Sequence, residues 1–375
     1  MKKIDRVFLG LVAVLVVLGF LILSSASLGM LVRDGFQFST LAGGQLIAIA
    51  IGILGMSAML FVPLPVLKKA APYLFGISIL ATLLVWIPGL GVEHNGALRW
   101  ISIAGFSFQP AELLKFGAVI FFAAWLAARQ STITTLKGGA LPFLGLLALI
   151  GSLLLMQPDT GTFLVIALAL TAMFVAAGAR MRDLAIIGGV GVVALGVLIV
   201  MRPYIMRRIM TFLDPTSDPL GAGYQLNQSL IAVGSGEWWG RGYGQSIQKF
   251  NFLPEPIADS IFSVAAEEFG FIGASVIIGL FVALAWRGMR IARESADLFG
   301  GLAALGLVIL IVAQSFMNIA SMIGVMPLTG LPLVFISNGG SAMIMALVSV
   351  GVILQVSRSR RIRAFRRASK IISSV

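Results

Sequence analysis

A single aspartate stands where a long polar stretch meets an apolar run. Asp259 follows two prolines, Pro254 and Pro256, and the apolar run begins at Ile261. Because a helix commonly begins after such a loop, we expect the carboxylate at the mouth of that helix. Two interpretations stay open: an N-cap that satisfies backbone amides at the helix start, or a general base that takes a proton from a substrate.

Two adjacent carboxylates, Glu267 and Glu268, lie two to three turns into the same apolar run. Carboxylates inside a membrane are costly unless they face a polar cavity or find partners. Their side chains leave a helix about 100° apart because there are about 3.6 residues per turn. At most one of them is therefore expected to share the face of Asp259.

A second charged set interrupts the apolar run near 109–128. Glu112 and Lys115 are three residues apart, so they share one helix face and can neutralise each other. Alternatively, Lys115 faces a cavity and binds an anionic ligand while Glu112 orients it. Just upstream, Arg99 and Trp100 offer a cation and an indole; we assign no role to His94, the only histidine.

The composition places these charges in a membrane protein. Hydrophobic residues make up 59% of the 375 residues and charged residues only 11%, whereas about 25% is usual in soluble domains. Mean hydropathy is +1.02. Cysteine is absent, which excludes disulfides, thiolate metal sites and a cysteine nucleophile. The net charge of +12 reports orientation in such a protein and does not indicate binding to nucleic acid.

The fold class that follows is an all-α polytopic membrane protein with ten transmembrane helices. We interpret the first apolar run as a helix and not as a cleaved signal peptide, because no small-residue cleavage site follows it. We treat residues 1–375 as one transmembrane domain. The predicted spans are 7–27, 43–63, 71–90, 109–128, 141–157, 162–179, 183–201, 260–286, 299–323 and 339–357.

Lysine and arginine indicate the orientation. With both termini in the cytoplasm, 19 of the 27 basic residues lie inside, as the positive-inside rule requires. The basic tail, 358–375, is then cytoplasmic, with affinity for anionic lipid headgroups. Eleven of the 15 acidic residues fall in outer loops or in spans, so we expect any chemistry on the outer side.

Two outer connections are long. Residues 91–108 form one, and residues 202–259, between the seventh and eighth predicted helices, form the other. A structureless loop of the second length is improbable in a compact protein unless it is functional. Its glycines alternate with amide and aromatic side chains, which favours a folded lid of short amphipathic pieces at the membrane interface.

Taken together, these residues resemble the SEDS family (shape, elongation, division and sporulation), which includes FtsW, RodA and SpoVE. The matching segments follow the family order over almost the whole chain: 24–27, 95–101, 106–115, 157–162, 224–225 with 228–229, 253–255 through 267–270, and 332–341. Each segment alone is a weak signal, but their combination is specific. The FtsW branch resembles this chain somewhat more than the others.

The resemblance implies roles for individual residues. The essential aspartate of the family corresponds to Asp259, and its sensitive tryptophan, glutamate and lysine correspond to Trp100, Glu112 and Lys115. The other candidates for substrate binding within the matching segments are Arg99, Gln225, Gln228, Glu267, Ser337 and Ser341.

Two positions depart from the family pattern. Most relatives have His-Thr before the aspartate, where this chain has Ile257 and Ala258. Relatives also have Tyr between the serine and the glycines that here are Ser337, Gly339 and Gly340, where this chain has Asn338. The details of the pocket are therefore expected to differ.

The implied activity is a peptidoglycan glycosyltransferase that polymerises lipid II on the outer face of the cytoplasmic (inner) membrane. The implied partners are a class B penicillin-binding protein that crosslinks the glycan and other membrane proteins of the divisome or elongasome. Such a reaction needs a base near the attacking hydroxyl and positive charge near the leaving pyrophosphate. Asp259 is the predicted base. Arg99 and Lys115, or a divalent cation such as Mg²⁺ or Mn²⁺, are the predicted sources of positive charge.

Two other functions compete. Ten helices with buried charges also describe a flippase or transporter of lipid II, although the unusual polar sequence is concentrated on the outer side. A non-catalytic scaffold of the cell-wall synthesis complex would leave Glu112, Lys115, Glu267 and Glu268 without an explanation.

Overall fold

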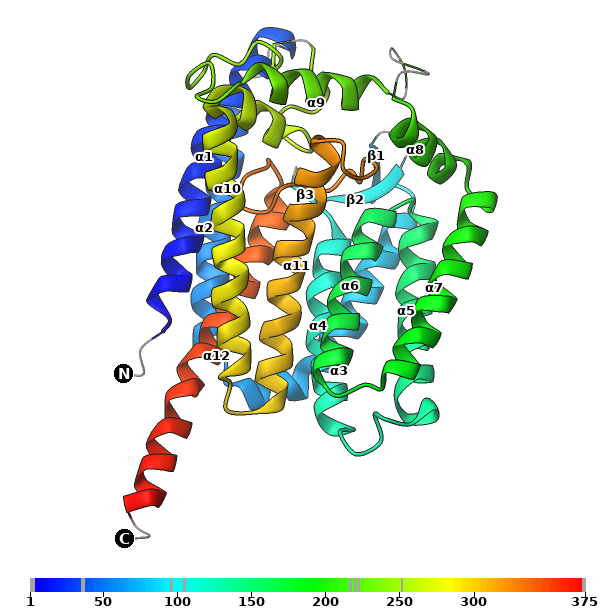
Figure 1. Cartoon of the computed structure of the whole chain (residues 1–375), viewed down its shortest axis with the longest axis vertical. Coiled ribbons are helices and arrows are strands. Elements are labelled where there is room, and N and C mark those ends of the chain that lie inside the picture. The colour runs from blue at the N-terminus through cyan, green and yellow to red at the C-terminus, as the bar shows by residue number, and fades with distance from the viewer. Residues whose placement is uncertain are drawn as a thin grey trace.

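The protein is a bundle of helices (Figure 1). Its structure, a computed structural model, describes residues 4–34, 38–94, 97–103, 106–215, 218, 221, 223–250 and 252–372. The longest helices are α1 (Arg6–Asp34), α2 (Phe38–Phe61), α3 (Leu64–Leu83), α4 (Pro110–Ala128), α5 (Leu141–Met156), α6 (Thr160–Ala176), α7 (Met181–Met201), α10 (Ile261–Arg293), α11 (Leu298–Met322) and α12 (Gly340–Ile372). A 3₁₀ turn, Leu84–Trp86, follows α3, and a π-helical turn, Leu136–Ala140, precedes α5.

Each predicted span overlaps one of these helices, which confirms a mostly helical polytopic fold. Within the described ranges, nine helices are long and apolar enough to cross a membrane. The tenth apolar helix, α6, has 17 residues, at the lower limit of about 17–25 residues for a span. The number of crossings and the side on which the termini lie stay predictions.

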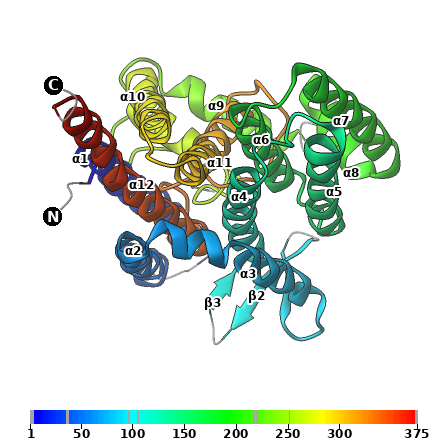
Figure 2. The same cartoon turned by 90° about the horizontal axis from the view of Figure 1, so that it is seen from below.

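Burial differs strongly between the helices. Viewed along the bundle, α4, α6 and α11 lie in the middle, α1, α2, α10 and α12 on one side, and α5 and α7 on the other (Figure 2). The helices α4 and α11 are largely buried along their length. In contrast, α7 buries only Asp183 and Ile187, so nearly all of its apolar surface faces outward, as suits a helix in lipid.

The long contact between α2 and α12 depends on glycine. A Cβ atom on Gly351 of α12 would lie 2.5 Å from the Met56 carbonyl oxygen of α2, and one on Gly52 would lie 2.5 Å from Leu347 Cδ1. Because such distances are too short for real atoms, these glycines permit the close approach, which is how small residues act between membrane helices.

A small antiparallel sheet precedes α4. Its strands are β1 (Gly91–His94), β2 (Ala97–Ile103) and β3 (Phe106–Phe108), in the order β1-β2-β3. Val92 pairs with Trp100, and Ile101 pairs with Phe108. These strands lie in residues 91–108, which were predicted to be a long connection without strands. The Asn-Gly dipeptide at 95–96, a strong hairpin signal, lies outside the described residues.

The long connection 202–259 contains two helices, α8 (Pro203–Leu213) and α9 (Tyr224–Ser235). Both lie at the end of the bundle that carries the sheet, opposite to the end where α12 terminates (Figure 1). Only Ile205 is buried in α8, so this helix covers the bundle and is not threaded through it. The end bearing α8, α9 and the sheet is the one that the sequence predicts to be outside.

The orientation can be tested with two cysteines, because the chain has none of its own. Ser235→Cys lies in α9, and Ser131→Cys lies in the exposed connection between α4 and α5. In intact spheroplasts we expect an impermeant thiol reagent to label the first variant and to label the second only after lysis. Labelling of Ser131→Cys alone in intact spheroplasts would reverse the orientation.

Candidate active site

A cavity of about 610 Å³ lies at the end of the bundle that carries the sheet. Its walls come from β2, α4, α8, α9, the segment before α10 and the segment before α12. Five of the ten predicted site residues line it: Arg99, Trp100, Glu112, Gln225 and Asp259. The other five, Lys115, Gln228, Glu267, Ser337 and Ser341, are not among its lining residues.

The backbone around Asp259 is fixed by three hydrogen bonds, which come from α11 and from the loop before α12. Asn318 Nδ2, on α11, donates to the Asp259 carbonyl oxygen at 2.7 Å. Ser337 Oγ donates to the Ala258 carbonyl oxygen at 2.6 Å, and the Asn338 amide donates to the Ile257 carbonyl oxygen at 2.8 Å. This segment therefore cannot move without breaking bonds to both α11 and the loop before α12.

The N-cap interpretation of Asp259 is wrong in this structure. The first helical residue of α10 is Ile261, and its N-cap is Ser260, whose side chain makes no capping hydrogen bond. Asp259 precedes the cap residue and is not itself the N-cap of α10. It lines the cavity instead.

Two predicted binding serines have structural partners. The hydroxyl of Ser337 accepts from the Leu333 amide at 2.8 Å while it donates to Ala258. The hydroxyl of Ser341, at the start of α12, accepts from the Gln109 amide at 3.3 Å, directly before α4. Both side chains are buried. They join the segments that form the cavity walls.

Three arginines line the cavity, two of which the sequence analysis did not single out. Arg99 on β2 donates through Nε to the Gln157 carbonyl oxygen at 3.0 Å and through Nη2 to that of Pro158. Arg207 and Arg208 come from α8. The signal that could have found them is the pair of adjacent arginines within the otherwise mostly apolar segment 203–213, which is compatible with an amphipathic helix.

Arg208 lies beside the predicted base. It donates through Nη1 to the Thr329 carbonyl oxygen at 3.3 Å. A Cβ atom on Gly330 would lie 3.7 Å from Asp259 Oδ2 and 3.8 Å from Arg208 Nη2, so the carboxylate and the guanidinium flank this glycine. Burial, and then the nearby Arg99, lower the pKa of Arg208, whereas Asp259 acts in the opposite direction. Arginine nevertheless stays protonated in proteins.

The charged pair on α4 is closed, meaning that its two side chains are buried and bonded to each other. Lys115 Nζ lies 2.7 Å from Glu112 Oε2 and 2.8 Å from Glu112 Oε1, and both side chains are less than one tenth exposed. Lys115 also donates to the Gln314 side-chain oxygen, and Gln314 Nε2 donates to the Pro332 carbonyl oxygen at 3.0 Å. Lys115 thus lies behind Glu112 and is tied to the cavity wall through α11.

The remaining predicted binding residues differ in position. Trp100 and Gln225 line the cavity, and Gln225 Nε2 donates to Ser260 Oγ at 3.2 Å, next to Asp259. Gln228, one turn further along α9, is partly buried outside the cavity lining. Its predicted binding role has no support from this arrangement.

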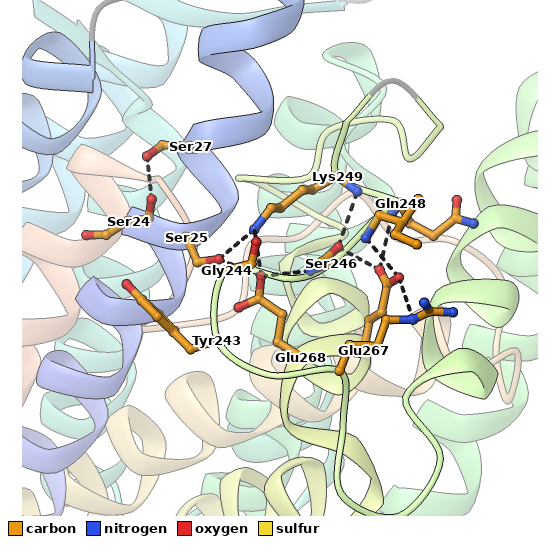
Figure 3. A network of polar contacts seen from close by, with 12 residues as sticks. Ser24, Ser25, Ser27, Tyr243, Gly244, Ser246, Gln248, Lys249, Glu267 and Glu268 are labelled. Atoms are coloured by element: carbon orange, nitrogen blue, oxygen red, sulfur yellow. Dashed lines mark hydrogen bonds and ion pairs between the residues drawn. The ribbon is translucent and has the colours of Figure 1, made fainter.

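Glu267 lies in a separate polar network (Figure 3). Its carboxylate accepts from Ser246 Oγ at 2.6 Å and from the amides of Ile247 and Gln248 at 3.0 and 3.2 Å. Arg241 Nε lies 3.3 Å from the same carboxylate. Glu267 and Glu268 find their partners in the loop 241–249, so both carboxylates are compensated without facing the cavity.

Four acidic residues line the cavity: Glu112, Asp159, Glu255 and Asp259. Asp159 caps α6 by accepting from the Thr162 amide at 3.2 Å. Among the residues that the structure describes, no group of three or more His, Cys, Asp or Glu side chains could hold a metal ion. The described residues therefore offer no all-protein cage, and a cation in this cavity would need substrate phosphate as a further ligand, as Mg²⁺ commonly takes.

Comparison with known proteins identifies the family. A family model described as "Cell cycle protein", for FtsW, RodA and SpoVE, matches residues 5–362. Stage V sporulation protein E of Bacillus subtilis (strain 168) is 40% identical over 328 residues, which are 88% of this chain and 89% of the relative. A probable peptidoglycan glycosyltransferase FtsW of Geobacter sp. (strain M18) is 38% identical over 95% of this chain and 97% of its own length.

Solved structures agree in fold. A chain of a peptidoglycan synthase complex that coordinates polymerization and crosslinking has a TM-score of 0.80 at 31% identity, over 96% of this chain and 99% of that one. The rod shape determining protein RodA of Thermus thermophilus has a TM-score of 0.70 at 29% identity, over 96% and 98%. The chain therefore belongs to the FtsW, RodA and SpoVE family, as its sequence motifs indicated.

Proposed function

We propose that this protein is an FtsW-like peptidoglycan glycosyltransferase that polymerises lipid II at the cavity containing Asp259. Relatives over nearly the whole chain are named peptidoglycan glycosyltransferases. The observation that carries the assignment of the site is that groups of opposite charge line one cavity. A carboxylate and a guanidinium flank Gly330, and two further arginines line the same space.

The proposed reaction divides the work between these groups. The 4-hydroxyl of the acceptor sugar attacks the anomeric carbon of the donor and transfers its proton to the Asp259 carboxylate. The new glycosidic C–O bond forms as the bond from that carbon to the pyrophosphate oxygen breaks. Arg99, Arg207 and Arg208 stabilise the negative charge that grows on the leaving lipid pyrophosphate, which is the electrostatic role that fixed cations play best in a partly dehydrated site.

The other lining residues position the two sugars. Trp100 offers an aromatic face to a sugar ring or to the lipid, and Gln225 offers an amide beside Ser260. A Mg²⁺ or Mn²⁺ ion, if bound, would be held by Asp259 and Glu255 together with substrate phosphate, and it would supply additional positive charge to the leaving group.

We place the reaction on the outer face of the cytoplasmic membrane, with a class B penicillin-binding protein as partner. The cavity lies at the end of the bundle that the distribution of basic residues predicts to be outside. A solved complex that coordinates polymerization with crosslinking contains a chain of the same fold. We propose other membrane proteins of the divisome or elongasome as further partners, and we propose no nucleic-acid partner.

Replacement of the base tests the mechanism. Asp259→Asn keeps the size of the side chain and leaves the bonds to the backbone of residues 257–259 intact. We expect the variant, purified with its penicillin-binding partner, to fold and bind lipid II but to lose about 10²–10⁴-fold in glycan synthesis. The measurement is polymerisation of labelled lipid II. Near-normal synthesis would exclude Asp259 as the base, and a wild-type complex that moves lipid II across vesicles without polymerising it would favour a flippase.

Removal of one cation tests the role of α8. Arg208→Gln should lower the polymerisation rate about 10²-fold, the usual loss when one donor to a developing charge is removed. Arg290→Gln is the matched control, because Arg290 lies at the far end of α10 and pairs with Glu294. Equal polymerisation rates for the two variants would show that Arg208 does not stabilise the leaving pyrophosphate.

The pair on α4 can be tested by restoring charge balance. Lys115→Met leaves the Glu112 carboxylate buried without its cation, and we expect a loss of about 3–5 kcal/mol in stability. The double change Glu112→Gln with Lys115→Met should recover the thermal midpoint. Polymerisation should stay low, because Glu112 lines the cavity. Recovery of both properties would mean that the two residues serve only to neutralise each other.

A further inference from the structure

A buried cluster lies between α1, α10 and the loop before Asp259 (Figure 3). Lys249 Nζ lies 2.7 Å from Glu268 Oε1, and it donates to Ser25 Oγ at 2.8 Å and to the Gly244 carbonyl oxygen at 2.9 Å. Ser25 Oγ donates to the same Glu268 oxygen at 2.5 Å. Three parts of the chain thus meet at one ammonium group. We call Ser25, Lys249 and Glu268 the clasp.

Stability alone does not explain the clasp. The side chains of Lys249 and Glu268 are both 0% exposed, and burying two charges costs about as much solvation as their attraction returns. Apolar side chains of similar size would fill the same space without that cost. Glu268 Oε2, moreover, has no hydrogen-bond partner among the described residues. A directional arrangement of this kind is better suited to fixing where the loop lies.

The clasp and Glu267 together fix the loop 241–249 on α10. Glu267 accepts from backbone amides of residues 247 and 248, and the amide of Ser246 donates to Glu268 Oε1 at 3.4 Å. The amides of Arg241 and Gly242 donate to the carbonyl oxygens of the two glutamates at 3.0 Å. The two adjacent carboxylates therefore hold one loop from two sides.

This loop leads directly to the predicted base. Lys249 is ten residues before Asp259, and short turns link the two. The Leu253 amide donates to the Gln248 carbonyl oxygen at 2.8 Å, and the Ser260 amide donates to that of Glu255 at 3.2 Å. A displacement at Lys249 would therefore act against the bonds that hold the backbone of residues 257–259.

Helix α1 contacts two segments near Asp259, namely the loop that contains Lys249 and the loop before α12. A Cβ atom on Gly29 would lie 2.2 Å from the Lys249 carbonyl oxygen, and one on Gly19 would lie 2.1 Å from that of Phe335. The segment that contains Phe335 carries Ser337, which holds Ala258. Because Gly19 and Gly29 have no side chains, α1 can pack closely against the backbone of both of these segments.

We propose that the clasp is a positioning device for Asp259, through which α1, itself outside the cavity lining, sets the place of the base. Ser25, Lys249 and Glu268 are not among the residues that line the cavity, and they act through the segment that leads from Lys249 to Asp259. This inference rests on the proposed function, in which Asp259 is the base.

The test compares kinetic and thermal effects in the full chain purified with its penicillin-binding partner. The variants are Ser25→Ala, Lys249→Met, and Lys249→Met combined with Glu268→Gln. Ser24→Ala is the matched control, because the Ser24 hydroxyl donates only within α1, to the Phe20 carbonyl oxygen. The measurements are kcat and KM for lipid II per folded molecule, and the thermal midpoint.

We expect Lys249→Met to lower kcat at least about tenfold with little change in KM, since a misplacement of about 1 Å can cost 10²-fold. Ser25→Ala should lower kcat about threefold, because both hydrogen bonds of the Ser25 hydroxyl are lost while the Lys249–Glu268 pair remains, and Ser24→Ala should not change it. The double variant strands no charge, so its thermal midpoint should recover while kcat stays low. That separation of stability from rate is what positioning predicts and what a purely structural role does not.

Two results overturn the proposal. One is a double variant with wild-type kcat. The other is a set of variants whose kcat per folded molecule equals that of Ser24→Ala. If Lys249→Met does not fold, Ser25→Ala and the double variant still decide. A wild-type complex that makes no glycan from lipid II would instead refute the proposed function, so the two failures are distinguishable.

Discussion

A charge carried into the apolar body of this protein must find an opposite charge there, and that requirement organises much of the structure. Lys115 meets Glu112 on α4, Lys249 meets Glu268 at α10, and Arg287 meets Asp5 at 2.8 Å where α10 passes the start of α1. Each pair lies at a contact between elements or is extended to one by a further hydrogen bond. The cost of burying an ion, which is several kcal/mol in proteins, thus makes a wrong arrangement of these elements much worse than the right one.

The cavity differs from these pairs because its charges face a shared open space. Arg99, Arg207 and Asp259 line about 610 Å³ at one end of the bundle. A polar ligand with separate anionic and hydroxyl parts can contact both signs of charge in such a space, whereas the closed pair of Lys115 and Glu112 offers no comparable room. Closed pairs such as Lys249 with Glu268 hold the fold, and charges that line the open cavity can do chemistry; Glu112 belongs to both groups, because it pairs with Lys115 and lines the cavity.

Local sequence signals predicted the helices well and the partners poorly. Apolar runs located ten helices, and the spacing of Glu112 and Lys115 placed them on one helix face, with pairing as one of two interpretations, because both inferences depend on residues within a turn or two. Lys249 and Ser25, in contrast, are 224 residues apart, and no local pattern connects them. The arginines of α8 were counted only as outer charges, and the strands at 91–108 are too short for alternation to stand out. Asp259 stood out from its place after two prolines at the start of an apolar run, the family resemblance then favoured it as the base, and its place before the cap needed the fold.

The bonds around Asp259 also explain how the sequence can depart from the family pattern beside the proposed base. Ile257 and Ala258 are held through their carbonyl oxygens, and Asn338 donates its backbone amide. Any residue except proline can supply these groups, so the departures at 257, 258 and 338 leave the support of the aspartate intact. Their side chains, however, line the cavity. Substitution there changes the surface presented to substrate while the position of the base is kept, which is the arrangement expected where one reaction is retained and its surroundings diverge.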